Sequence, residues 1–332
     1  MTHQTPPADQ ASAVSFNFSV FKVLAILGVA LSHWPVSPDL PTWIPGNIGL
    51  VIFAFSSGMF SARIYGVEVD VARFWRKKIE RLLVRYWFLL AFLSVLLLAE
   101  GRTVFHWHSL VHVFGLSGVL NLFGASASSL GAGLWFFTLL LLFYVAYPYL
   151  ARLAAASRGD FLLPLATTVF FFYLNEHVIL PFSLWLTTLG FILGVVVGMD
   201  DTRVPARVSL TMTVAALALL LVSNVLLHYK PANPDLIALA CVTVNLWLMR
   251  ARIPQWTVLR GVARLENCLL EIFIIHTYLF IHPTGISALD FVISMVFAAA
   301  VAWVLNIVGN RLIKLVFNKA GAQRAAVAPA QQ

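Results

Sequence analysis

The stretch FSVFKVLAILGVALSHW, residues 18–34, is apolar along almost its whole length but contains two ionisable side chains, Lys22 and His33. A helix of about 20 largely apolar residues, within a range of about 17 to 25, crosses the hydrocarbon of a bilayer. The stretch reaches this length, and an ionisable group inside it is costly unless it faces a cavity or a partner. We therefore predict a membrane-spanning helix with a polar stripe.

The rest of the chain has the same apolar character. Of its 332 residues, 60% are hydrophobic and 11% are charged, whereas soluble domains contain about 25% charged residues. Because the apolar excess extends along the whole sequence, it excludes a soluble globular protein and leaves no separate soluble domain. Ten stretches qualify or nearly qualify as membrane spans. They lie near residues 18–34, 47–62, 85–99, 133–150, 161–179, 182–199, 208–228, 235–249, 267–282 and 285–308.

The basic residues lie between these stretches and indicate which loops face the cytoplasm. With ten spans and the N-terminus inside, all of the 22 Lys and Arg residues except Arg102 and Lys230 fall on the cytoplasmic side. Cytoplasmic loops of membrane proteins carry such an excess. We predict an all-α, polytopic transmembrane helical bundle of about ten spans with both termini in the cytoplasm. The net charge of +8 then reflects topology and contact with membrane lipids, and nucleic acid is not an expected partner.

One membrane domain is expected between two polar tails. Residues 1–15 contain no Lys or Arg, unlike the positively charged start of a cleaved secretory signal. Their Pro, Ala and Gln content, like that of AGAQRAAVAPAQQ at residues 320–332, is typical of a disordered segment. The expected organisation is thus a disordered tail over 1–15, a transmembrane domain over 16–319 and a disordered tail over 320–332.

Lys22 and His33 are 11 residues apart, which is about three helical turns and about 16 Å of rise, so they share one face of the first helix. In the simplest interpretation Lys22 snorkels to the surface and His33 belongs to an interfacial helix end. In the functional interpretation the imidazole, with an ordinary pKa of about 6.5, is a general base toward an alcohol or a proton relay of a transporter. Spacing alone leaves these alternatives open.

Glu271 and His276 lie in the ninth expected span, five residues apart. This separation turns the second side chain by about 140° around the helix, so the two cannot pair on one face. We expect Glu271 to meet a group on another helix or an asparagine such as Asn245. His276 can join His33 if the first and ninth spans are neighbours. An ordinary polar contact between packed helices is the alternative for both residues.

The segment RKKIERLLVRYW, residues 76–87, is the densest cationic region of the chain. Such a segment beside a membrane span either binds anionic lipid headgroups and fixes topology, or holds the phosphates of a cytosolic polyanion such as a nucleotide-bearing cofactor. The spacing of His106, His108 and His112, without a neighbouring carboxylate or cysteine, gives little support for a metal site. No metal is therefore expected.

Several of these segments together resemble the integral membrane acyltransferase family 3, and the resemblance covers nearly the whole chain. KVLAILGVALSHW is similar to the family's Arg or Lys followed after ten residues by His, which places Lys22 and His33 on its motif positions. VIFAFSSGMF, residues 51–60, is similar to a Phe-rich stretch that ends in Ser-Gly-Phe, although Met59 replaces the last Phe.

Three later segments extend the resemblance. KKIERLLVRYW follows the family's basic pattern with Val84 in place of a proline, LWFFTLLLLFYVAYP follows a Leu-Trp stretch that ends in Tyr-Pro, and LLEIFIIH follows the end of a late helix. Many members have glutamates where this chain has Leu140 and Leu141, so any role of those acids is absent here. The motif positions carried over from these segments are Lys77, Lys78, Arg81, Trp135, Tyr144, Pro148, Glu271 and His276.

The resemblance implies an acyl-CoA-dependent O-acyltransferase of the bacterial inner membrane. Its donor would be cytoplasmic acyl-CoA, usually acetyl-CoA, and its acceptor a hydroxyl of a cell-envelope glycan or a lipid-linked saccharide. A proton-coupled transporter or a flippase of such a substrate is the rival function, and a homo-oligomer or partners from envelope biosynthesis stay open. The implied catalytic residues are His33, Glu271 and His276, and the implied donor-binding residues are Lys22, Lys77, Lys78, Arg81, Trp135 and Tyr144.

Overall fold

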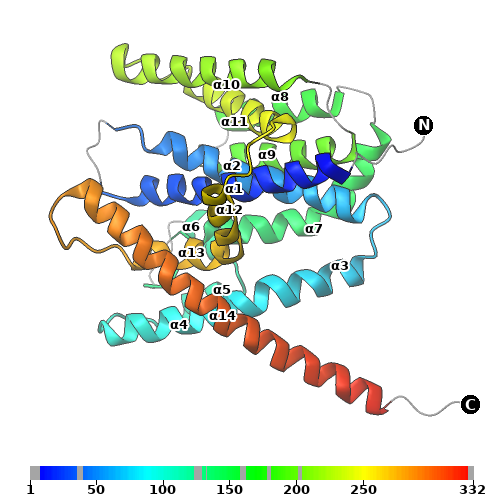
Figure 1. Ribbon diagram of the computed structural model, residues 1–332, viewed down its shortest axis with the longest axis vertical. Coiled ribbons are helices and arrows are strands. Elements are labelled where there is room, and N and C mark those ends of the chain that lie inside the picture. Colours follow the sequence, from blue (N-terminus) through cyan, green and yellow to red (C-terminus); the bar gives the residue numbers. More distant parts are fainter. Residues whose placement is uncertain are drawn as a thin grey trace, which may run out of the picture.

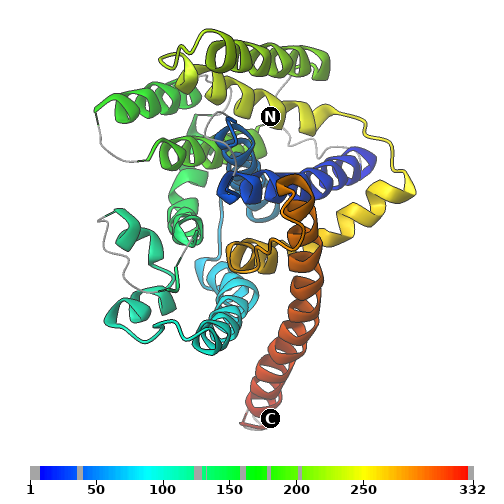
Figure 2. The ribbon, with the colours of Figure 1, turned by 90° about the vertical axis from the view of Figure 1, so that its left-hand side faces the viewer.

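A computed structural model of the chain describes residues 8–35, 40–122, 129–131, 133–157, 162–177, 181–200 and 204–327. This described part consists of helices and connecting segments without a β-strand, which confirms the all-α fold class. In Figure 1 and Figure 2 the C-terminal helix, coloured orange to red, extends away from the other helices.

Six helices are long and apolar enough to cross a membrane, as judged by length and composition. The sequence therefore produces the multi-pass membrane architecture that its composition predicts. One of these spans continues from α10 into a π-helical turn, η2 (Val222–Leu226). The six are α1 (Ala8–His33), α2 (Trp43–Tyr65), α7 (Trp135–Ala156), α9 (Phe182–Met199), α10 (Ala206–Leu221) and α14 (Ser287–Val327).

Shorter helices and one further 18-residue helix fill the space between these spans. Three short segments are π-helical or 3₁₀-helical continuations of neighbouring helices. The elements are α3 (Val71–Lys78), η1 (Ile79–Leu83), α4 (Val84–Ala99), α5 (Trp107–Val113), α6 (Ser117–Leu122), α8 (Leu162–His177), α11 (Asn233–Arg250), α12 (Thr257–Arg264), η3 (Leu265–Cys268), α13 (Leu269–Ile275) and η4 (His276–Tyr278).

The ten predicted spans all contain helix, but several are too short to be counted as membrane spans. Helices α4 and α8 have 16 residues each, and residues 161 and 178–179 of the fifth stretch lie outside the described residues. The ninth stretch, residues 267–282, divides into η3, α13 and η4, of which α13 has 7 residues. The count of ten and the cytoplasmic position of both termini therefore stay predictions.

Three helices, α1, α2 and α9, pack closely at the centre of the fold. Glycines permit this approach because they carry no side chain. A Cβ added at Gly49 of α2 would lie 2.5 Å from the carbonyl oxygen of Ala25 on α1. A Cβ added at Gly194 of α9 would lie 2.2 Å from the carbonyl oxygen of Phe55 on α2. Small residues thus hold α2 between its two neighbours, as is typical of membrane helices.

The C-terminal part of the chain fixes the end of α1. Trp34, directly after α1, donates its indole N–H to Oγ of Ser287 at the start of α14 (3.0 Å). Its ring packs against those of Phe280 and His282, with centroids 4.9 and 4.7 Å away. Helix α13 contacts α1, α4 and α14. The first and ninth predicted stretches are therefore neighbours in space.

Helix continues into both segments that were expected to be disordered tails. Helix α1 begins at Ala8, inside residues 1–15, and α14 ends at Val327, inside residues 320–332. Residues 1–7 and 328–332 lie outside the described residues.

Candidate active site

Two pockets follow one another along the same helices. The first, here named the lysine pocket, has a volume of about 360 Å³ and is lined by Lys22 of α1 and Lys78 of α3. The second, here named the histidine pocket, has a volume of about 510 Å³ and is lined by His33 at the end of α1. Helices α1, α2, α7 and α13 contribute to both. The two ionisable residues on one face of α1 thus face two successive cavities.

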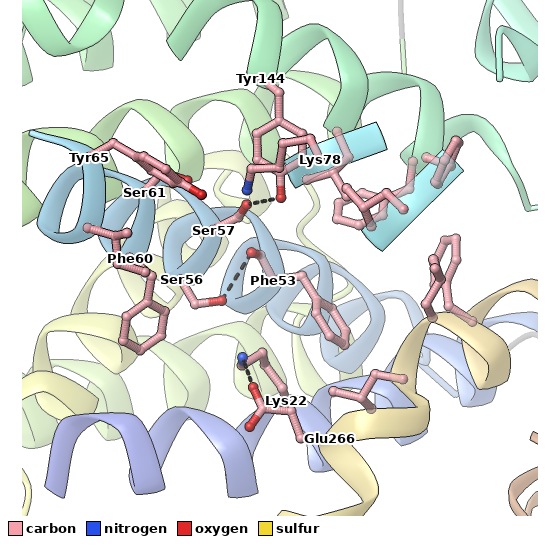
Figure 3. Close-up of a pocket in the computed structure, with 18 residues that line it drawn as sticks. Lys22, Phe53, Ser56, Ser57, Phe60, Ser61, Tyr65, Lys78, Tyr144 and Glu266 are labelled. Carbon is pink, nitrogen blue, oxygen red and sulfur yellow. Dashed lines mark hydrogen bonds and ion pairs between the residues drawn. The ribbon is translucent and has the colours of Figure 1, made fainter. Parts of the chain in front are cut away.

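The lysine pocket combines cationic and hydroxyl groups with apolar walls (Figure 3). Lys22 forms an ion pair with Glu266 of η3. On the other side of the pocket in Figure 3, Nζ of Lys78 lies 3.7 Å from the centroid of the Tyr144 ring. The hydroxyl of Tyr144 and Oγ of Ser57 are 2.8 Å apart and share a hydrogen bond. Such a pocket suits a ligand with an anionic end and an apolar arm.

The predicted donor-binding residues are divided between the pockets. Nζ of Lys77 lies 5.9 Å from the ring centroid of Tyr65, a lining residue of the lysine pocket, but Lys77 does not itself line it. The side chain of Arg81 lies outside the described residues. Trp135 lines the histidine pocket, so the structure separates it from the basic residues. Of the predicted donor-binding residues, Lys22, Lys78 and Tyr144 line the lysine pocket.

The histidine pocket is aromatic, and His33 is the one titratable side chain among its described lining residues. Among its described lining residues there is no Asp, Glu, Lys or Arg. Indole rings provide flat apolar surfaces, whereas hydroxyl and amide groups provide neutral hydrogen bonds. This composition suits a neutral hydroxylated ligand. The indole and neutral polar residues of the pocket are Trp34, Trp43, Trp135, Ser32, Thr42, Asn47 and Ser183.

His33 and His276 meet across the bundle, as expected if the first and ninth stretches are neighbours. Nδ1 of His33 lies 3.1 Å from Nε2 of His276. Nδ1 of His276 lies 2.8 Å from the carbonyl oxygen of Phe273 and 3.1 Å from that of Ile272. A carbonyl oxygen only accepts hydrogen bonds, so the proton of neutral His276 is on Nδ1 and its Nε2 is an acceptor. His33 must therefore donate from Nδ1.

These tautomers leave Nε2 of His33 unprotonated, on a residue that lines the histidine pocket. The arrangement is that of a general base whose orientation and tautomer are fixed by a second residue. His276 is 1% exposed and is absent from the lining of both pockets. Its described contact with the histidine pocket is therefore the hydrogen bond to His33, and its predicted catalytic role stays a prediction.

Glu271 belongs to a different, buried cluster. Its Oε1 lies 3.7 Å from Nη1 of Arg85 on α4 and accepts a hydrogen bond from Nδ2 of Asn306 on α14 (3.1 Å). The expectation of a partner on another helix is thus confirmed. The expected asparagine partner is also present, but it is Asn306 and not the suggested Asn245, which donates to the carbonyl oxygen of Cys241 (2.7 Å). Glu271 lines neither pocket, so its catalytic role stays a prediction from the motif alone.

Replacing Glu271 by alanine should destabilise the protein by about 3 kcal/mol, because it leaves the charge of Arg85 without its buried partner. Replacement by glutamine keeps the volume and an acceptor for Asn306, so a smaller loss is expected. Thermal unfolding in detergent measures both effects. Glu176→Gln, at an exposed position of α8, is the control. If Glu271→Ala melts at the same temperature as the parent protein, the cluster does not hold α4, α13 and α14 together.

The histidines of the 106–112 segment have local partners. Nδ1 of His112 and Oγ of Ser117 are 2.7 Å apart, and burial lowers the pKa of this imidazole. Among the described residues, no three His, Cys, Asp or Glu side chains lie close enough together to hold a metal ion.

Sequence reasoning missed two residues that surround the site. Glu266 is the counter-ion of Lys22 across 244 residues, and Asn306 is the amide partner of Glu271 across 35 residues. A charged side chain inside a predicted span requires a partner, so the sequence did indicate that Lys22 and Glu271 each have one. That signal does not select one carboxylate or amide among several.

The comparisons with known proteins agree with the sequence motifs. A family model described as an acyltransferase domain matches residues 16–307, which is most of the chain. No curated protein and no solved structure shows a match. The matched region includes both pockets and the His33–His276 pair. The chain therefore belongs to acyltransferase family 3 and is a membrane acyltransferase.

Proposed function

We propose that this protein transfers an acyl group, acetyl in the first instance, from acyl-CoA in the lysine pocket to a hydroxyl in the histidine pocket. The acceptor is a cell-envelope glycan or a lipid-linked saccharide, and the membrane is the bacterial inner membrane. The observation that carries the proposal is the placement of a cationic pocket and an imidazole-bearing neutral pocket along a single helix, α1.

The two pockets match the two proposed substrates. The phosphates of CoA are anionic and fit beside the ammonium group of Lys78, whereas Lys22 is paired with Glu266. The pantetheine arm of CoA fits between the apolar walls of the lysine pocket. A sugar ring has apolar faces and neutral hydroxyls, which fit the indole rings and uncharged polar groups around His33. The excess of basic residues in every second predicted loop supports a donor that binds from the cytoplasmic face.

In the proposed reaction, Nε2 of His33 takes the proton of the acceptor hydroxyl while the oxygen attacks the thioester carbonyl carbon. The new C–O bond forms, the C–S bond breaks, and the imidazolium returns the proton to the leaving thiolate. The products are the acyl ester and free CoA thiol. Nε2 of His276 accepts a hydrogen bond from Nδ1–H of His33 throughout and stabilises the transient positive charge.

The proposed activity can be measured with the purified protein in detergent, labelled acetyl-CoA and an envelope glycan extract. Label should move to the glycan fraction, and mass spectrometry should find an added acetyl ester. If neither glycan labelling nor release of free CoA is detected with acetyl-CoA or longer acyl-CoA thioesters, the proposal is wrong.

Replacing Lys78 by glutamine should raise the KM for acetyl-CoA about 10-fold with little change in kcat, because a contact between its ammonium group and phosphate is lost. Steady-state kinetics with varied acetyl-CoA measure the change. Lys230→Gln, at an exposed position outside both pockets, is the control. An unchanged KM would assign Lys78 to membrane topology instead of donor binding.

A further inference from the structure

Among the described residues, the lysine and histidine pockets share one lining side chain. Phe273 of α13 is the one described residue that lines both. Otherwise each shared helix contributes different residues to the two cavities, such as Phe136 and Trp135 of α7. Phe273 is therefore the side chain at which the lining of the lysine pocket meets that of the histidine pocket.

Phe273 belongs to a row of packed rings. Its centroid lies 5.4 Å from that of Phe136, which lies 6.3 Å from that of Phe53 in α2. On the other side, the Phe273 ring lies 6.1 Å from the imidazole of His276. Phe53, Phe136 and Phe273 together are here named the aromatic wall. All three line the lysine pocket, so the wall ends this cavity next to the histidine pair.

We propose that Phe273 determines which acyl groups are transferred, by limiting their length and by shielding the thioester from hydrolysis. This inference rests on the proposed acyltransferase function. A two-carbon acyl group needs displacement of one ring. A longer chain must also displace Phe136 and Phe53, which are packed in the interior. Close-packed side chains in a protein interior resist displacement. One methylene that does not fit an apolar site changes kcat/KM by about 10- to 200-fold.

The side chain of Phe273 can be changed without removing the hydrogen bond that orients the histidine pair. That bond goes from Nδ1–H of His276 to the backbone carbonyl oxygen of Phe273, which every residue at position 273 retains. A smaller side chain therefore opens the wall while the tautomers of His33 and His276 stay the same.

The experiment compares the parent protein with Phe273→Ala and the milder Phe273→Leu. Release of free CoA is measured from acetyl-, butyryl- and hexanoyl-CoA, with and without the glycan fraction that the parent protein acetylates. Phe273→Ala should raise the ratio of hexanoyl to acetyl transfer at least about 10-fold and should raise acceptor-free hydrolysis by a similar factor. Phe273→Leu should give a smaller change in the same direction.

The control is Phe143→Ala, which removes an equally buried ring of α7 that stacks on Phe191 and lines neither pocket. It tests the loss of a buried aromatic ring as such and should leave the acyl preference unchanged. If Phe273→Ala does not fold, Phe273→Leu decides. If the parent protein is active but the folded Phe273 variant has the same acyl preference and the same hydrolysis rate, the inference about Phe273 is wrong. The proposed function is then unaffected. A parent protein inactive with every thioester overturns the proposed function instead.

Discussion

His33→Ala is expected to reduce acyl transfer by a factor of about 100 to 10,000, which is the usual contribution of a general base. The variant loses the nitrogen that takes the proton of the acceptor hydroxyl, while both pockets and the donor-binding lysine side chains remain. Binding of acetyl-CoA should therefore persist. The loss is measured as kcat for transfer of labelled acetyl groups to the glycan fraction, and a thermal-shift titration with CoA reports donor binding.

His177→Ala is the control for this experiment. His177 is an exposed histidine at the end of α8, outside both pockets, and its replacement should leave transfer unchanged. If His33→Ala is folded and transfers acetyl groups at the parent rate, the assignment of His33 as the base is wrong. A loss of CoA binding in the same variant would indicate a damaged fold rather than a missing base.

His276→Phe should reduce kcat about 100-fold and leave the KM for acetyl-CoA nearly unchanged. Phenylalanine fills the space of the imidazole but cannot accept the hydrogen bond from Nδ1 of His33. The free imidazole of His33 can then turn or adopt the other tautomer, in which Nε2 carries the proton and is no base. Steady-state kinetics separate this effect on the chemical step from an effect on donor binding.

His276→Gln provides a conservative comparison. Its amide offers an N–H to the carbonyl oxygen of Phe273 and an oxygen to the Nδ1–H of His33, as the imidazole does. We expect kcat of the glutamine variant to be about 10-fold higher than kcat of the phenylalanine variant. Equal activities of the two variants would show that the ring of His276 only fills space. A parallel rise of the KM would place His276 in donor binding.

The membrane architecture and part of the site could be predicted from the sequence. Hydropathy acts over about 20 consecutive residues, so α1, α2 and α14 are visible as apolar stretches. Helix geometry relates residues of one element, which is why Lys22 and His33 were correctly placed on one face. Motif order was enough for the family, which the match over residues 16–307 confirms.

The count of spans was less predictable because a short apolar stretch fits several structures. Residues 267–282 have the composition of a span, yet they form a 7-residue α-helix between two 3₁₀ segments. Hydropathy does not distinguish a membrane span from a short helix that is buried by its neighbours. In this segment, α13 is enclosed by α1, α4 and α14.

The sequence by itself determined that the chain is an all-helical membrane protein with an ionisable stripe on its first helix, since these properties depend on residues near one another in the chain. Only the tertiary structure decided that His33 is hydrogen-bonded to His276, that Glu266 pairs with Lys22, and that Phe273 lines both pockets. The contacts of His33 and Lys22 join residues more than 200 positions apart in the chain. The position of Phe273 depends on how the helices around both pockets pack. Helical periodicity gives the direction of a side chain around its own axis, but the neighbour that it meets is set by the packing of the whole bundle.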